Sequence, residues 1–361
     1  MAASSSTSSF ELTPDERVSR GRWPLGLIGF LVVLLLVEVV ASARHEWFAD
    51  MAAWQWETKR SLLADGTLDG EIAIFGTSVL FHGLDPTAAN AAGGPAGPAG
   101  QRRVVNLALN GMMLQHETQL LRERLASAVP PSVVILEFRR VSVEQSSWTS
   151  GPYFRFWASA GDFLESRFYY WNLPLGLSFL DNRMSTVFRY REGVDNWLFE
   201  SAHLRTFASQ VRDRNQETTK EMRKYAGLAR ATFENDELKT PEGPAPAREW
   251  VSTPAGVLWL YRFLDLASAH HLRVVLLIPP SPPYFVETSG PDGYRQRLGA
   301  QLDAIRARYP DLNLEVFEIK DFAVDEFADP VHVNAKGRVR MSAEFASWLA
   351  GYRQRQKLDG R

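Results

Sequence analysis

The chain has 361 residues, of which 45% are hydrophobic and 23% charged, and its formal net charge is -2. This composition is typical of globular proteins and excludes a mainly disordered or collagen-like chain, while the near-neutral charge argues against nucleic acid as a partner. The lack of cysteine in the sequence excludes disulfides, cysteine zinc sites and a cysteine nucleophile.

The first predicted element is a membrane anchor at residues 24–43, an apolar run with a single charge at Glu38. At about 1.5 Å per residue the run extends roughly 30 Å, the thickness of the hydrocarbon core of a bilayer. Three arginines lie shortly before it and one follows directly. Residues 1–23 are therefore expected to form a cytoplasmic, disordered tail, with the main domain outside the membrane.

Two other interpretations of this run remain open. Ala41-Ser42-Ala43 has the small-residue pattern of a signal-peptidase site, so cleavage before Arg44 is an alternative to a retained anchor, although the run is longer than a usual signal sequence. A buried core helix is the second alternative, but the run has no polar face to turn to water. Under either membrane interpretation, residues 45–361 act beyond the membrane.

Five apolar runs rich in β-branched residues follow the anchor, at 71–76, 103–107, 132–138, 272–280 and 312–319. Their apolar residues are continuous rather than alternating, as in strands that are covered on both faces. Helical patterns lie at 114–128, 253–271, 293–309 and 335–353. This alternation predicts a doubly wound α/β domain with a parallel five-stranded sheet, formed by residues 44–139 and 253–361.

Two segments interrupt the alternation. Residues 88–101 are small and uncharged, and they predict a surface loop. Residues 140–252 predict a mostly helical insertion or cap that opens with many aromatic residues. Three of these aromatic residues, Trp148, Tyr153 and Trp157, are candidates for stacking on sugar rings or for docking on a membrane partner. Burial within the cap is the simpler explanation for them.

Three loops at carboxyl ends of the predicted strands hold residues that suit acyl chemistry. After the first strand, Gly76 permits a sharp turn that delivers Ser78 to a helix start, where backbone N–H groups can stabilise an oxyanion. A helix cap formed by Thr77 or Ser78 is the competing explanation. After the second strand, Asn110-Gly111 can expose a backbone N–H to a substrate or can simply form a turn.

The third loop is Asp329-Pro330-Val331-His332, just before the last helix. An aspartate that accepts from the imidazole orients His332 and stabilises its charged form, which is what a general base requires. Alternatively, Asp329 only shapes the turn and His332 is a packed or solvated histidine. Asn334 is expected to cap the helix that follows.

This set of residues resembles the SGNH hydrolase family, also called GDSL-type esterases, over about residues 71–350 without the insertion. The resemblance implies a flavodoxin-like sheet with Ser78 as nucleophile, and with Asp329 and His332 completing the triad. It also implies that Gly111 donates to the oxyanion beside the backbone N–H of Ser78.

The sequence departs from the family pattern at two places. The usual Gly-Asp-Ser reads Gly-Thr-Ser at 76–78, and the Gly-x-Asn-Asp expected after the third strand reads Glu137-Phe138-Arg139-Arg140. The family's asparagine donor is therefore missing, and Arg139 or Asn110 is a candidate replacement. Loss of one donor typically costs about 10²–10³ in rate. Arg139 is also a candidate substrate-binding residue.

The same departures, together with one N-terminal anchor, resemble the membrane-tethered branch that includes the teichoic acid D-alanine transfer protein and the alginate O-acetylation proteins. The resemblance implies a serine acyl esterase or O-acyltransferase in the plasma membrane of a bacterium. It would act outside that membrane on an envelope or secreted polysaccharide, beside a membrane-bound O-acyltransferase partner. No metal or other cofactor is expected. The alternative is an inactive scaffold that binds a glycan or such a partner, and the distances within the triad discriminate between the two.

Overall fold

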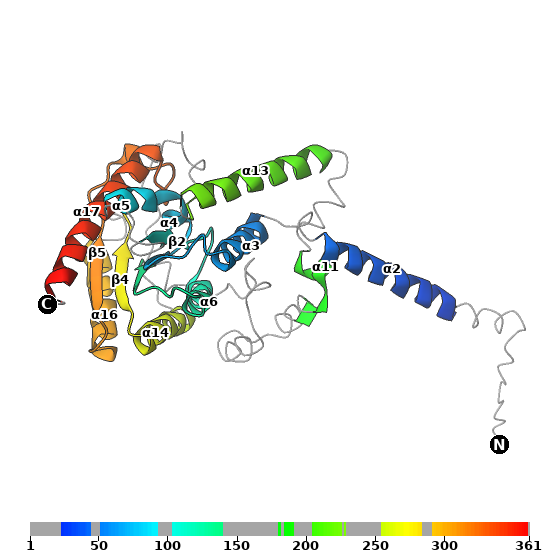
Figure 1. Ribbon diagram of the computed structural model, residues 1–361, viewed down its shortest axis with the longest axis horizontal. Helices are drawn as coiled ribbons and strands as arrows, with labels where there is room; N and C mark the ends of the chain where they lie inside the picture. Colours follow the sequence, from blue (N-terminus) through cyan, green and yellow to red (C-terminus); the bar gives the residue numbers. More distant parts are fainter. Residues whose placement is uncertain are drawn as a thin grey trace, which may run out of the picture.

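The computed structural model describes residues 23–44, 51–92, 103–139, 180–181, 184–190, 204–225, 227–228, 254–283 and 291–359. Within these residues the chain forms an α/β domain, and an apolar N-terminal helix projects from it (Figure 1). The predicted five-stranded parallel sheet is confirmed.

The strands are β1 (Ile72–Phe75), β2 (Val104–Asn106), β3 (Val133–Glu137), β4 (Arg273–Ile278) and β5 (Leu314–Glu318). They follow the order β2-β1-β3-β4-β5, and every neighbouring pair is parallel. This order places a topological switch point beside β1, where the chain leaves β1 toward one side and later strands are added on the other. Ligand sites of open α/β sheets gather at the carboxyl ends of strands at such points.

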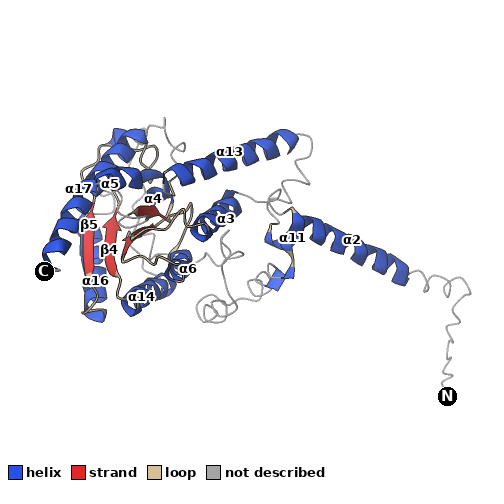
Figure 2. Cartoon of the chain, viewed as in Figure 1, coloured by secondary structure: helices blue, strands red, loops and turns tan. Residues whose placement is uncertain are grey.

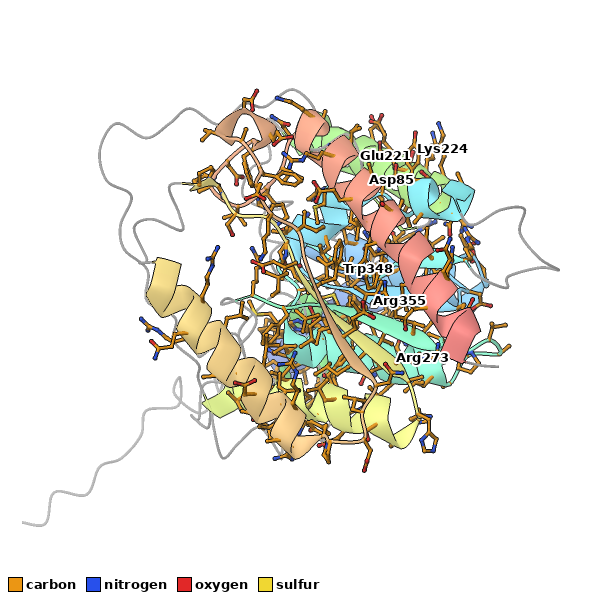
Figure 3. The ribbon with its side chains drawn as sticks, turned by 90° about the vertical axis from the view of Figure 1, so that its left-hand side faces the viewer. Asp85, Glu221, Lys224, Arg273, Trp348 and Arg355 are labelled. Carbon is orange, nitrogen blue, oxygen red and sulfur yellow. The ribbon has the colours of Figure 1, made fainter. Side chains whose placement is uncertain are left out.

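Helices cover both faces of the sheet (Figure 2). They are α4 (Ser78–Gly83), α5 (Pro86–Ala92), α6 (Leu114–Leu125), α14 (Pro254–Ala269), α16 (Pro291–Arg308) and α17 (Ala335–Asp359), and a short 3₁₀ turn, η3 (Val324–Glu326), precedes α17. Helix α17 packs on α4 and α5, and α14 packs on α6. Figure 3 shows Trp348 and Arg355 on α17, where both side chains donate to Glu315 of β5, at 3.2 and 2.7 Å.

The predicted loop at 88–101 is wrong over its first residues, because α5 extends to Ala92. Asp85 caps this helix: its Oδ1 accepts from the backbone N–H of Thr87 at 2.8 Å, and Pro86 occupies the first helical position. Asn90 then bonds the backbone of Val104 at both its N–H and its carbonyl, which fixes α5 against β2. The Asp-Pro pair was the local signal for this helix, and the small residues after it concealed its length.

The N-terminal helix α2 (Trp23–Ala43) contains one stretch, Leu25–Ala43, that is long and apolar enough to cross a membrane. Its mean hydropathy is 2.7, and only 6% of the stretch is buried against the rest of the protein. Helix α3 (Met51–Ala64) follows and was not predicted. The described parts of the insertion include α11 (Thr186–Arg189) and α13 (Leu204–Lys224). Helix α13 lies along α3, where Trp54 Nε1 donates to Thr219 Oγ1 at 2.9 Å.

Candidate active site

The turn after β1 delivers Ser78 as the first residue of α4. Thr77 is the N-cap residue, and its hydroxyl accepts from the backbone N–H of Val79 at 3.3 Å. The capping function therefore belongs to Thr77, while Ser78 is partly exposed in the first turn of the helix. Backbone N–H groups of a first helical turn have no partner within the helix, so they can receive a developing negative charge.

His332 lies between Ser78 and Asp329. Its Nε2 is 2.7 Å from Ser78 Oγ, and its Nδ1 is 2.7 Å from Asp329 Oδ2. Both distances are those of good hydrogen bonds. The structure therefore brings together the serine, the histidine and the aspartate that the sequence analysis selected, although Ser78 and His332 are 254 positions apart.

The loop before α17 holds Asp329 and His332 in this arrangement. Asp329 Oδ1 accepts from the backbone N–H groups of Val331 and His332 at 2.7 and 2.8 Å. Partial burial raises the pKa of Asp329, but the hydrogen bonds from the side chain and backbone of His332 outweigh it, so the pKa lies below its usual value. The loop ends at Asn334, whose Oδ1 accepts from the backbone N–H of Gly337 at 3.1 Å, which confirms the predicted cap.

The loop after β2 runs beside the Ser78 turn, because the backbone N–H of Leu109 donates to the carbonyl of Gly76 at 3.2 Å. Asn110 and Gly111 are the central residues of a turn that is closed from Met112 N to Leu109 O. Gly111 has a φ of 64° and is exposed, and an added Cβ would meet nothing within 4 Å. Glycine is favoured here by the backbone conformation rather than by lack of space.

His82, one helical turn after Ser78, joins this group. It is only 3% exposed, and its Nε2 is 2.7 Å from Asn110 Oδ1. Its ring stands edge-on to the ring of His332, with centroids 6.3 Å apart. This histidine is packed and hydrogen-bonded, and its position between Asn110 and His332 makes it part of the site.

Glu137, at the end of β3, is a site residue that the sequence analysis did not select. Its carboxylate is fully buried and accepts from the backbone N–H of Thr77 at 2.7 Å and from the hydroxyl of Thr77 at 3.0 Å. Gly76 is required for this approach, since a Cβ there would lie 2.6 Å from Glu137 Oε2. A carboxylate that ends a continuous apolar strand was the available signal.

Arg139 completes this network. Its Nε is 2.6 Å from Glu137 Oε1, and its Nη2 donates to Thr77 Oγ1 at 2.8 Å. The guanidinium therefore contributes to the turn that precedes Ser78. The other three candidate substrate-binding residues, Trp148, Tyr153 and Trp157, lie outside the described residues.

Two further ionisable groups, His116 and Glu117 in the first turn of α6, are buried. Burial raises the pKa of Glu117 well above its usual value, and the Glu137 carboxylate adds to the shift while Arg139 opposes it. Burial also lowers the pKa of His116 to about 3, and Nδ1 of this neutral ring accepts from Met113 N at 3.1 Å.

The described residues contain no group of three or more His, Asp or Glu side chains arranged to hold a metal ion. The chain matches no protein-family model and no curated protein. What the site contains is a hydroxyl, an imidazole and a carboxylate in one hydrogen-bonded series, beside a helix N-terminus and a glycine turn. This arrangement can activate a serine toward an acyl carbon.

Proposed function

We propose that this protein is a serine acyl esterase or O-acyltransferase. The observation that carries the proposal is the series Ser78 Oγ, His332 and Asp329, in which both hydrogen bonds are 2.7 Å. An inactive scaffold has no need to keep these three groups within hydrogen-bonding distance, and these separations therefore favour the enzyme.

In the proposed reaction, Ser78 Oγ attacks the carbonyl carbon of an acyl ester while its proton passes to His332 Nε2. Asp329 stabilises the resulting imidazolium through Nδ1. The tetrahedral intermediate collapses, the bond from the acyl carbon to the leaving oxygen breaks, and His332 returns the proton to that oxygen. Water or a sugar hydroxyl then loses its proton to His332 and attacks the acyl-serine, which releases the acid or the new ester and restores Ser78.

The proposed oxyanion hole consists of the backbone N–H groups of Ser78 and Gly111 together with the side-chain amide of Asn110. Because Asn110 Oδ1 faces His82, the amide nitrogen lies on the other side of the group. In this proposal His82 is a positioning residue that sets the direction of the Asn110 amide. Asn110 thereby replaces the asparagine donor that is missing after β3.

The proposed family is the SGNH hydrolase family. The two places where this sequence departs from the family pattern have one structural explanation. The threonine of Gly-Thr-Ser and Glu137 at the end of β3 bind one another, and Arg139 binds both. In this proposal a single local network beside Ser78 takes the place of two family motifs. The strand order is the 2-1-3-4-5 order of flavodoxin-like sheets, which is consistent with this family.

The proposed setting is the outer side of a bacterial plasma membrane, with α2 as a retained anchor and residues 1–23 in the cytoplasm. Helix α2 supports this setting by its length, its apolarity and its exposure. The proposed substrate is an acylated envelope or secreted polysaccharide, and the proposed partner is a membrane-bound O-acyltransferase that supplies or receives acyl groups.

The full chain in detergent micelles should hydrolyse an aryl acetate and should react at Ser78 with a fluorophosphonate. Ser78→Ala and His332→Ala should each lower kcat/KM by roughly 10⁴-fold or more, because nucleophile and base act as a unit. Mass spectrometry of the Ser78 peptide after exposure to acyl donors would identify the acyl group. Added polysaccharide that consumes the acyl-serine faster than water does would identify transfer.

The matched controls are Ser132→Ala and His271→Ala. Ser132 directly precedes β3, at the amino ends of the strands and away from Ser78, and His271 is exposed. Neither substitution should change the rate. If the wild-type chain and the Ser78 and His332 variants show the same rate, and the fluorophosphonate does not modify Ser78, the enzyme proposal fails and the scaffold takes its place.

A further inference from the structure

Residues 184–190, which contain α11, are held against the C-terminal end of α2. Glu38 accepts from the hydroxyl of Ser185 at 2.7 Å and from the backbone N–H groups of Thr186 and Val187. The hydroxyls of Ser42 and Thr186 are 2.8 Å apart. Figure 1 shows α11 beside this end of α2.

The same segment is also attached to the start of α3. The hydroxyl of Tyr190 donates to Glu57, and Tyr190 is buried with Ala41 and Ala53, while Val187 packs against this small cluster. A segment of the insertion is therefore fixed where the apolar helix meets the α/β domain.

Residues 180–181 and 184–190 expose three large apolar side chains. Leu180, Met184 and Phe188 are 51%, 81% and 49% exposed. Outside α2, the described residues include only two other exposed large hydrophobic side chains, Val129 and Val339. A concentration of three such side chains in nine positions of one segment is unusual for a surface that faces only water.

The contacts with α2 define the depth of this segment. Glu38 lies five positions before the last residue of α2, which at about 1.5 Å per residue is only about 7.5 Å from the helix end. In a bilayer this is the region where hydrocarbon meets headgroups, and interfacial segments bury their apolar side chains about 5–10 Å deep there. The donors from 185–187 also satisfy the one charged group in the apolar run, as a carboxylate at such a depth requires.

We propose that residues 180–181 and 184–190 form an interfacial anchor, which lies on the lipid surface at the C-terminal end of α2 with Leu180, Met184 and Phe188 among the acyl chains. This inference rests on the proposed membrane crossing by α2. Its effect is to limit the tilt of the domain relative to the membrane, because a single helix leaves the domain free to tilt and a second lipid contact beside that helix opposes this motion.

The lack of cysteine in the chain permits a direct test, because each introduced thiol is the only one. Leu180→Cys, Met184→Cys and Phe188→Cys, made singly in the full chain, are labelled with a polarity-sensitive fluorophore and reconstituted in phosphatidylcholine vesicles. Iodide on both sides of the bilayer quenches labels in water, and lipids with a doxyl group near the headgroup quench labels at the interface. Val339→Cys on α17 is the water-exposed control, and Leu31→Cys in α2 is the control for the span.

The expected result is that labels at 180, 184 and 188 lose most of the iodide quenching seen at 339 and gain quenching by the doxyl lipid. Iodide quenching equal to that at 339, with the label at 31 protected, overturns the interfacial anchor and leaves the span intact. Protection from both quenchers also overturns it, because a protein surface then covers the segment. An iodide-accessible label at 31 refutes the membrane crossing itself, and the anchor with it.

Discussion

At the scale of single residues, the site depends on side chains that act through others. Asn110 and His82 show this most clearly, because the amide oxygen of Asn110 is held by a histidine whose ring also borders His332. An amide that is oriented before substrate arrives loses no rotational freedom when the oxyanion forms. Preorganisation of this kind is the main source of oxyanion stabilisation.

The first prediction concerns this pair. Asn110→Ala should lower kcat about 10²–10³-fold with a small change in KM, since a donor to the oxyanion acts only in the transition state. His82→Phe keeps a ring beside His332 but removes the hydrogen bond, so it should show a smaller loss of kcat in the same direction. The rates of acylation and deacylation of the aryl ester are the measurement.

His82→Gln provides the control, because its amide can still donate and should recover part of the rate that His82→Phe loses. Equal losses in both His82 variants would indicate that the ring serves packing only. An unchanged kcat in Asn110→Ala would remove Asn110 from the oxyanion hole and would leave Arg139 as the candidate donor.

At the scale of elements, each helix start near the site is completed by a side chain. Thr77 caps α4, Asp85 caps α5 and Asn334 caps α17. Helix α6 uses a different group, since Nδ1 of the buried His116 accepts from the backbone N–H of Met113. This cap exists only while the ring is neutral, because a protonated imidazole has no acceptor.

The second prediction is the pH dependence of this cap. The pKa of His116 is about 3 in the folded chain and about 6.5 when unfolded, so the unfolded state binds a proton that the folded state does not. This histidine therefore has no effect on stability above pH 6.5, and it lowers the free energy of unfolding as pH falls from 6.5 toward 3. The loss is about 1.4 kcal/mol per pH unit, or about 2 kcal/mol at pH 5.

His116→Gln keeps an acceptor for Met113 and cannot titrate, so its acid destabilisation between pH 6.5 and 5 should be smaller than that of the wild type by that amount. Denaturant unfolding of the full chain in micelles, followed by tryptophan fluorescence, measures this difference. His270→Gln, at an exposed position, should retain the slope of the wild type. Parallel curves for His116→Gln and the wild type would contradict the prediction.

At the scale of the whole molecule, the insertion and the α/β domain meet at a buried lysine. Lys59 of α3 donates to the carbonyl of Asn106 at the end of β2 and, at 2.6 Å, to the carbonyl of Gly227 just after α13. Gly227 has a φ of 104°, and any Cβ there would collide with the carbonyl of Asn106. Burial lowers the pKa of Lys59 well below its usual value.

The third prediction is that Lys59→Met lowers the free energy of unfolding by about 1–3 kcal/mol, because the substitution removes the ammonium donor from two buried carbonyls. The end of α13 should also become more sensitive to limited proteolysis, as its contact with β2 weakens. Arg60→Ala, which removes an exposed ion pair with Glu123 on the same helix, should cost less than about 1 kcal/mol. Equal effects of the two variants would mean that Lys59 does not join the insertion to the sheet.

Much of the fold could be predicted because it depends on local patterns. The five strands were identified by continuous apolar runs, and each observed strand lies within its predicted range. Helix α3 was not predicted: it buries Gln55, Thr58 and Lys59 along with apolar residues, so it lacks a clear apolar face. Its helical form depends on packing with α13 and the domain rather than on its own pattern.

The sequence alone was sufficient for the apolar span, the parallel sheet and the choice of Ser78, Asp329 and His332 as candidates. The pattern of apolar residues shows which positions of one element are buried, and the type of a residue determines which chemistry its side chain can perform. Only the tertiary structure decided that Glu137 and Arg139 bind Thr77, that His82 holds Asn110, and that Glu38 meets α11. The bonds of Glu137, Arg139 and Glu38 cross 60 to 147 positions, and the bond of His82 to Asn110 joins helix α4 to the loop after β2. These contacts depend on the order of the strands and on where the insertion packs, and neither can be predicted from a local sequence pattern.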